Sequence, residues 1–160
     1  MKNLSHFDKN SRAKMVDITE KRVTVREALA QAEIYIKEET LEKILENKIA
    51  KGDTLNIAKT AGIMASKNTP SLIPLCHPLM ITNIDIDFEI NKGKSCITIK
   101  SNVKSEGKTG VEMEALCAVM ISALTIYDMC KAEDKNITIS NICLLKKSGG
   151  KSGNFIRGSK

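Results

Sequence analysis

Residues 83–103 read NIDIDFEINKGKSCITIKSNV, and apolar and polar side chains alternate on both sides of Asn91-Lys92-Gly93-Lys94. Alternation with a period of two is typical of strands buried on one face. A short link containing glycine joins two such strands as a β-hairpin. Residues 83–90 and 95–103 are therefore predicted to pair antiparallel.

The rest of the chain mixes further strands with helices. Alternating apolar residues predict strands over 26–36 and 137–145, and helical spacing predicts helices over 38–47 and 109–132. Asp53 is placed to cap another helix that runs through Ser66. Three prolines at 70, 74 and 78 are expected to exclude helix across 69–78 and to leave Leu75-Cys76-His77 on a rigid extended or turning segment.

This order of elements favours an α+β fold, with helices packed on one face of a mainly antiparallel sheet, over a doubly wound fold. The 160 residues suit one domain. We expect a mobile N-terminal arm at 1–12, a single catalytic domain at 13–147 and a flexible Gly/Lys/Ser-rich tail at 148–160. The broad apolar surface of the long helix indicates an oligomer.

Composition narrows the class of partner. A formal charge of +6 favours anionic ligands such as nucleotide phosphates, nucleic acid or acidic lipid. Aromatic residues make up only 3% of the chain, which argues against nucleic acid because single-strand binders stack bases on aromatic side chains. The longest uncharged apolar segment, Ala115 to Tyr127, is too short to span a bilayer, and the N-terminus lacks a signal peptide, so we expect a cytoplasmic protein with no membrane partner.

The five cysteines show neither C-x-x-C pairs nor zinc spacing, so reduced and mostly buried thiols are expected. The acidic residues form no recognisable metal-ligand motif. We therefore expect no tightly bound cofactor or metal, which leaves room for Mg²⁺ carried by a phosphate-bearing ligand. The tail segment Ser148-Gly149-Gly150-Lys151-Ser152 is not a Walker-type phosphate loop, because Leu145 stands where that motif needs glycine.

The densest group of chemical side chains lies on the long helix. Asp128 and Lys131 are one turn apart on one face, where they form either an ordinary surface pair or, if partly buried, a proton-transfer pair in which the pKa of Lys131 falls. Glu112 and Glu114 either complement the helix dipole or belong to a site. His77 has either a structural role or a role in binding a phosphate or exchanging a proton. Spacing predicts a basic cleft but no particular reaction.

Several long motifs carry a resemblance that covers nearly the whole chain. They are Met15-Val16-Asp17-Ile18, Lys51-Gly52-Asp53, LIPLCHPL at 72–79, TGVEMEAL at 109–116, LTIYDMCKA at 124–132 and KSGGKSG at 147–153. Together they closely resemble the cyclic pyranopterin monophosphate synthase family, molybdenum cofactor biosynthesis protein C.

The resemblance implies a ferredoxin-like subunit in a homohexamer, a trimer of dimers, with active sites between subunits. It implies a lyase that converts 3′,8-cyclo-7,8-dihydroguanosine triphosphate to cyclic pyranopterin monophosphate and releases pyrophosphate. A radical S-adenosylmethionine GTP cyclase would supply that substrate.

The resemblance also implies roles for matching residues. Asp128 and Lys131 would manage proton transfers during opening of the guanine-derived ring, assisted by Lys51. Glu112 would position the base-derived portion, and Arg26 and Lys147 would contact phosphate. The other implied substrate contacts are Leu75, Cys76, His77, Met113 and Glu114.

Two alternatives stay open at this stage. One is a basic nucleic-acid or protein-binding module without catalysis, which salt-dependent binding to unrelated oligonucleotides would favour. The other is a metal-assisted nucleotide hydrolase that uses Glu112, Glu114, Asp128 and His77, which loss of activity with a chelator would support.

Overall fold

The computed structural model describes residues 12–151 and 153–158, so the predicted arm at 1–12 lies outside the described residues except for Arg12. The elements in chain order are β1 (Thr24–Tyr35), α1 (Glu38–Leu45), α2 (Thr54–Lys67), α3 (Thr69–Leu72), β2 (Ile81–Asn91), β3 (Cys96–Gly107), α4 (Glu112–Cys130), β4 (Thr138–Ser148) and β5 (Phe155–Ile156). The predicted hairpin, flanking strands and long helices are confirmed, with Asp53 at the N-cap of α2.

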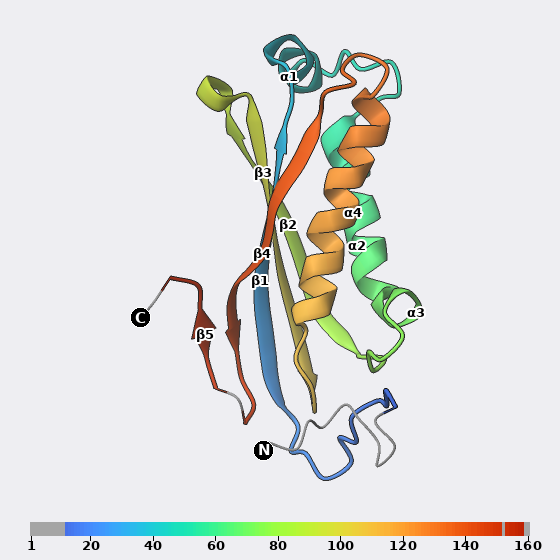
Figure 1. Cartoon of the computed structure of the whole chain (residues 1–160), viewed down its shortest axis with the longest axis vertical. Coiled ribbons are helices and arrows are strands. Elements are labelled where there is room, and N and C mark those ends of the chain that lie inside the picture. Colours follow the sequence, from blue (N-terminus) through green and yellow to red (C-terminus); the bar gives the residue numbers. More distant parts are fainter. Residues whose placement is uncertain (1–11, 152, 159–160) are drawn as a thin grey trace.

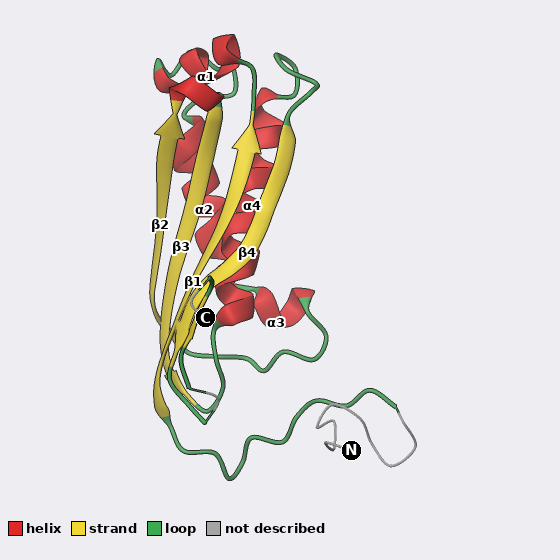
Figure 2. Cartoon of the chain, turned by 60° about the vertical axis from the view of Figure 1, so that its left-hand side comes forward, coloured by secondary structure: helices red, strands yellow, loops and turns green. Residues whose placement is uncertain are grey.

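The strands of the described chain form one antiparallel sheet in the order β2-β3-β1-β4-β5. Figure 2 shows α2 and α4 side by side on one face of this sheet. The succession of elements, with β1 and β3 at the centre, is the β-α-β-β-α-β arrangement of ferredoxin-like folds. The predicted α+β class is therefore confirmed.

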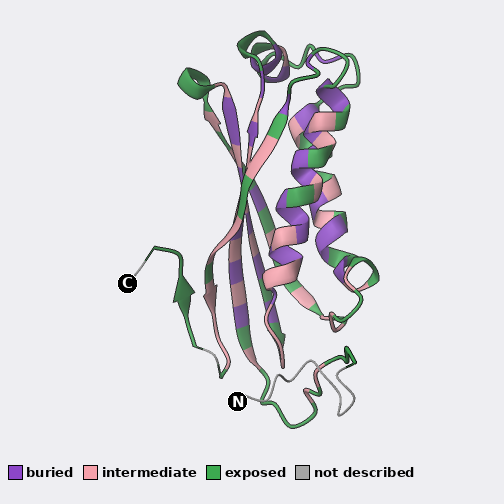
Figure 3. Ribbon diagram, in the orientation of Figure 1, coloured by how far each residue is buried: buried purple, intermediate pink, exposed green. Residues whose placement is uncertain are grey.

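Small residues bring α4 close to the sheet. The helix-facing side of β1 presents buried alanines at 28, 30 and 32, and α4 presents buried alanines at 115, 118 and 123 (Figure 3). Among the described residues, α4 is the one helix with the length and apolarity of a membrane span, but 56% of its apolar window is buried within the fold. It is the core helix.

The two long helices also approach each other closely, at Gly62 of α2. A Cβ atom at this position would overlap the Ser122 hydroxyl and come within 2.8 Å of the Ala118 carbonyl oxygen on α4. Ser122 Oγ donates a hydrogen bond of 3.0 Å to the Ala58 carbonyl oxygen. This crossing fixes the start of α2 beside the end of α4 (Figure 1).

Two segments differ from expectation. The exclusion of helix across 69–78 was wrong for Thr69–Leu72, where Pro70 lies in the first turn and its missing amide donor costs no intrahelical bond. The segment predicted as a tail contains β5, in which Phe155 and Ile156 pair with Lys147 and Lys146 of β4. The tail thus adds to an existing edge rather than folding independently.

Candidate active site

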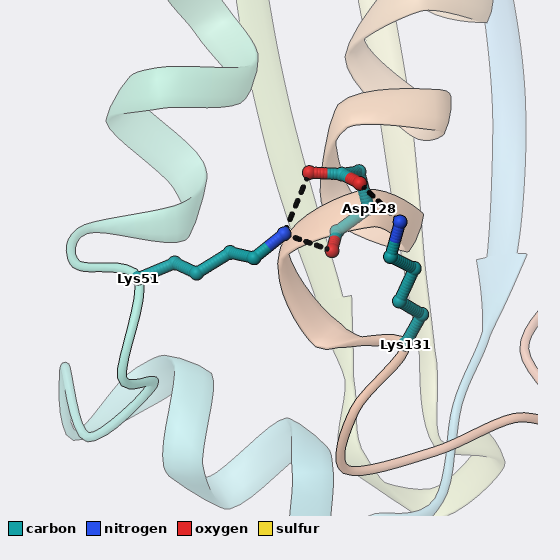
Figure 4. A network of polar contacts seen from close by, with 3 residues as sticks. All are labelled: Lys51, Asp128 and Lys131. Carbon is teal, nitrogen blue, oxygen red and sulfur yellow. Dashed lines mark hydrogen bonds and ion pairs between the residues drawn. The ribbon is translucent and has the colours of Figure 1, made fainter.

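Lys51, Asp128 and Lys131 meet at the C-terminal end of α4 (Figure 4). Lys51 Nζ donates to Asp128 Oδ2 at 2.8 Å and also to the Asp128 backbone oxygen at 2.8 Å. Lys131 Nζ lies 2.7 Å from Asp128 Oδ1. Both oxygens of one carboxylate therefore hold an ammonium group, and both cations lie at the negative end of the helix dipole.

Local backbone geometry explains how Lys51 reaches a residue 77 positions away. Gly52 has a φ of +102°, a conformation that L residues with a Cβ rarely adopt, and it turns the chain directly after Lys51. Asp53 Oδ1 then accepts a hydrogen bond of 3.1 Å from the Asn56 amide and starts α2. The Lys51-Gly52-Asp53 motif is thus a lysine, a turn and a helix cap beside the end of α4.

The contacts in this group favour the charged forms of Asp128 and Lys131. Hydrogen bonds from Lys131 and Lys51 lower the pKa of Asp128 to about 2. The hydrogen bond and charge of Asp128 in turn raise the pKa of Lys131, whose side chain is 54% exposed. A lowered Lys131 pKa, expected if that side chain were desolvated, is therefore not what this chain produces alone.

A second group surrounds the start of α4, at the opposite end of the molecule. A pocket of about 440 Å³ lies there, within the size range of small-molecule sites. It contains six of the predicted substrate-binding residues: Leu75, Cys76, His77, Glu112, Met113 and Glu114. The structure thus brings these two sequence segments together, and their contact with substrate stays a prediction.

The interior of this pocket changes the acidity of its side chains. Glu114 is 3% exposed, and burial raises its pKa, with a smaller contribution from the charge of Glu112. Burial likewise raises the pKa of the Cys76 thiol, with further contributions from Glu114 and Cys117. The surroundings of Glu114 and Cys76 in this pocket therefore disfavour negative charge on either side chain.

The two predicted phosphate contacts lie beside this pocket. Lys147 Nζ binds Glu112 Oε1 at 2.8 Å, and both side chains are about one-quarter exposed. Arg26 is 8% exposed and donates from Nε to the Gly107 carbonyl oxygen at 3.3 Å. In the sheet Lys147 pairs with Ala28, two residues from Arg26 on the same strand face, so the two cations are diagonal neighbours.

The predicted site residues thus form two groups rather than one cleft. Glu112 and Asp128 are 16 positions apart on α4, which corresponds to about 24 Å along its axis. Sequence spacing places Glu114 and Asp128 on similar faces of the helix. It also keeps them about four turns apart along the helix axis, so they do not meet. Within the described part of one chain the two groups stay apart, and the expectation of active sites between subunits stays a prediction.

Comparison with known proteins decides the family. The MoaC family profile matches residues 15–150, a span that contains both groups. The chain belongs to the MoaC family. The predicted resemblance is therefore confirmed.

MoaC relatives from three bacteria match nearly the full chain, and each is named cyclic pyranopterin monophosphate synthase. The protein of Thermoanaerobacter pseudethanolicus is 57% identical over 155 residues, which cover 97% of this chain and 98% of the relative. That of Listeria monocytogenes is 59% identical over 153 residues, covering 96% and 95%. That of Heliobacterium modesticaldum is 52% identical over 157 residues, covering 98% and 99%.

The pocket also has residues that sequence reasoning did not assign to the site of this MoaC chain. They come from the segment before β1, from the loop before β2 and from the approach to α4, and they are Val16, Ile18, Lys21, Leu79, Thr109 and Gly110. Val16 and Ile18 belong to a motif that contributed to the resemblance, which is the signal that would have found them. Lys108 Nζ donates to the Thr19 carbonyl oxygen at 2.6 Å and ties the two segments together.

Metal binding was expected to be absent from the protein itself. Across residues 12–151 and 153–158, no group of three or more His, Cys, Asp and Glu side chains is placed to hold a metal ion. The five cysteines are free thiols, three of them buried. Cofactor independence stays a prediction for this MoaC chain.

Proposed function

We propose that this chain converts 3′,8-cyclo-7,8-dihydroguanosine triphosphate to cyclic pyranopterin monophosphate and releases pyrophosphate, as a phosphorus–oxygen lyase of molybdenum cofactor biosynthesis. Relatives at 52–59% identity over nearly the full length carry the name of that synthase. The observation that carries the proposal is the Lys51–Asp128–Lys131 group, which joins two chain segments of the family match in one charged cluster.

The cluster suits a reaction that begins with a triphosphate and ends with two phosphorylated products. Two ammonium groups stabilise negative charge on the departing pyrophosphate, because charge-assisted hydrogen bonds to phosphate are stronger than neutral ones. Asp128 orients both lysines before substrate binds. In the proposed mechanism Lys131 and Asp128 move protons during ring opening, and Lys51 assists them.

The pocket at the other end of α4 suits the remainder of the substrate. Its apolar wall and the Cys76-His77 segment would contact the ring system, while Glu112 would position the base-derived portion. Arg26 and Lys147 would contact phosphate. Binding of phosphate to Lys147 would compete with its present ion pair to Glu112.

A second copy of the chain is proposed to complete the site. An exposed stripe of α4 runs from Asp128 through Leu124 (53% exposed) to Met120 (46% exposed), residues four positions apart on one helix face. Ile57 and Met64 of α2, the helix that packs on α4, are also exposed. Such a patch is typical of a protein–protein contact.

Two-fold symmetry makes this surface suitable for building the site. Met120 lies midway between Glu112 and Asp128, so an axis beside Met120 that pairs two α4 helices antiparallel brings the Asp128 end of one copy to the Glu112 end of the other. Each pair would then hold two composite sites. The homohexamer implied by the resemblance would contain three such pairs.

The remaining expectations form part of the same proposal. A radical S-adenosylmethionine GTP cyclase would supply the cyclised nucleotide in the cytoplasm. Any Mg²⁺ requirement would follow the triphosphate rather than a set of protein ligands. Neither nucleic acid nor a membrane would take part.

The test is direct incubation of the purified protein with the cyclised nucleotide, with mass spectrometry of the products. Stoichiometric pyranopterin and pyrophosphate are expected. Lys135→Ala, which removes an exposed lysine outside the cluster, is the matched control and should leave turnover unchanged. The mono- or diphosphate of the cyclised nucleoside as the sole product, with its formation lost on addition of a chelator, would instead identify a metal-assisted hydrolase.

A further inference from the structure

Three glycines in the loop between β4 and β5 share a left-handed backbone but differ in their surroundings. Gly149, Gly150 and Gly153 have φ values of +93°, +78° and +68°. A Cβ atom on Gly149 would overlap the Val25 carbonyl oxygen, and one on Gly150 would overlap the Arg26 guanidinium. At Gly153 nothing lies within 4 Å of such an atom.

Gly150 therefore lies directly against the head group of Arg26. The guanidinium is held on another side by the Gly107 carbonyl oxygen, which accepts from Nε at 3.3 Å. With only 8% of the residue exposed, Arg26 has little room for a different rotamer. The direction of its remaining donors is set by the Gly150 backbone on one side and the end of β3 on the other.

The segment after Gly150 is itself anchored. The Gly153 amide donates to the Gly150 carbonyl oxygen at 3.1 Å and closes a turn. Beyond that turn, β5 pairs with β4, and Arg157 donates from its amide and from Nε to the Leu145 and Leu144 carbonyl oxygens, each at 2.8 Å. The pairing of β5 with β4 thus holds the end of the chain in place, with Gly149 and Gly150 packed against Val25 and Arg26 of β1.

We infer that Gly150 is a positioning residue, which acts through Arg26 to aim its guanidinium at a phosphate group of the substrate. This rests on the proposed function, in which Arg26 contacts phosphate. A side chain at position 150 would displace the guanidinium from its place beside the Gly107 carbonyl oxygen. The Gly-rich motif at 147–153 then serves anion binding indirectly, through the arginine, rather than by wrapping a phosphate.

The test uses inorganic tripolyphosphate as probe and calorimetry as readout, on the full chain. Gly150→Ala is expected to weaken binding about tenfold or more, as loss of a charge-assisted hydrogen bond would. Gly153→Ala, which introduces the same backbone strain in open space, should bind within about twofold of the wild type.

A double-mutant cycle separates positioning from a general structural effect. Arg26→Ala should weaken binding as Gly150→Ala does, and Arg26→Ala/Gly150→Ala should bind no more weakly than Arg26→Ala alone. If Gly150→Ala lowers the melting temperature by more than Gly153→Ala does, Arg26→Ala/Gly150→Ala should recover this additional loss, because the guanidinium that the new methyl group would overlap is no longer present.

Wild-type affinity in Gly150→Ala, or losses that add in full in the double variant, would overturn the inference. Turnover of the cyclised nucleotide is measured in parallel. A wild-type protein that forms no pyranopterin while the binding cycle is non-additive would remove the proposed function but keep the coupling of Gly150 to Arg26.

Discussion

The two ends of α4 hold charge in opposite ways. At the C-terminal end, Asp128 and its two lysines are exposed, and each charge has a partner of opposite sign. At the N-terminal end, Glu114 is buried and its pKa is raised by desolvation, within a pocket that has apolar walls. One end presents exposed cations, and the other presents an enclosed pocket with Arg26 and Lys147 beside it.

The separation between these two ends is the reason for proposing that a second chain completes the site. Chemistry on a nucleotide triphosphate requires charged groups close to an enclosed substrate, but α4 keeps the two about 24 Å apart. The same helix that separates them also offers the apolar stripe on which a second copy can pack. The long core helix is thus both the spacer and the proposed contact surface.

The largest expected effect comes from removing the charged end. Lys51→Ala, Asp128→Ala and Lys131→Ala should each lower kcat about a thousandfold or more, because each removes a group proposed to act on the reacting atoms. Thermal unfolding should stay close to that of the wild type, since all three side chains are exposed in the single chain. Near-normal turnover in any variant would remove that residue from the catalytic group.

A charge placed in the stripe between the ends should separate the two copies. Met120→Lys would bury an ammonium group at the proposed axis, so light scattering should give a smaller assembly and turnover should be lost with it. Ile142→Lys, an exposed apolar-to-lysine change on β4 in the other layer, is the matched control for the added charge. An unchanged assembly in Met120→Lys would rule out this helix face as the contact.

The pH dependence of stability should expose the buried carboxyl group. Because the folded-state pKa of Glu114 is raised above its ordinary value of 4.5, its contribution is fully present below that pH and is lost as pH rises through the folded pKa. Glu114→Gln should therefore raise the free energy of unfolding, relative to the wild type, more at pH 7 than at pH 4. Urea titrations at both pH values measure this difference, and equal shifts would contradict it.

The smallest expected effect is a change in the pKa of Asp128, at the C-terminal end of α4. The pKa of Asp128 should be about 2 by NMR, so its contribution to stability is present above the ordinary value of 3.8 and is lost as pH falls through about 2. Lys131→Met should raise that pKa because it removes the largest cause of the shift. A value that does not move on this substitution would mean that the ion pair is absent in solution.

Sequence patterns predicted the secondary structure well because period and capping are local. Asp53 as an N-cap and the 91–94 link each depend on a few neighbouring residues. Pro70 misled the prediction because proline breaks a helix interior but fits a first turn. β5 was missed because two residues carry no periodic signal, and its formation depends on the edge of β4.

The site was predictable only in part. The resemblance selected the residues, but their separation into two groups depends on where along α4 each one lies. The contact of Lys51 with Asp128 also depends on the close helix crossing at Gly62, which only the structure shows. The partner of Arg26 at Gly150 lies in a tail that composition alone marked as flexible.

Subunit complementation tests most directly whether two chains build one site. Asp128→Ala and His77→Ala chains, each nearly inactive alone, are coexpressed in equal amounts; random pairing should restore about a quarter of wild-type activity, because a mixed pair keeps one intact composite site. Coexpressed Asp128→Ala and Lys131→Ala chains, both altered at the same end, should stay inactive. If the first mixture is no more active than its separate components, the two ends of α4 do not meet across copies.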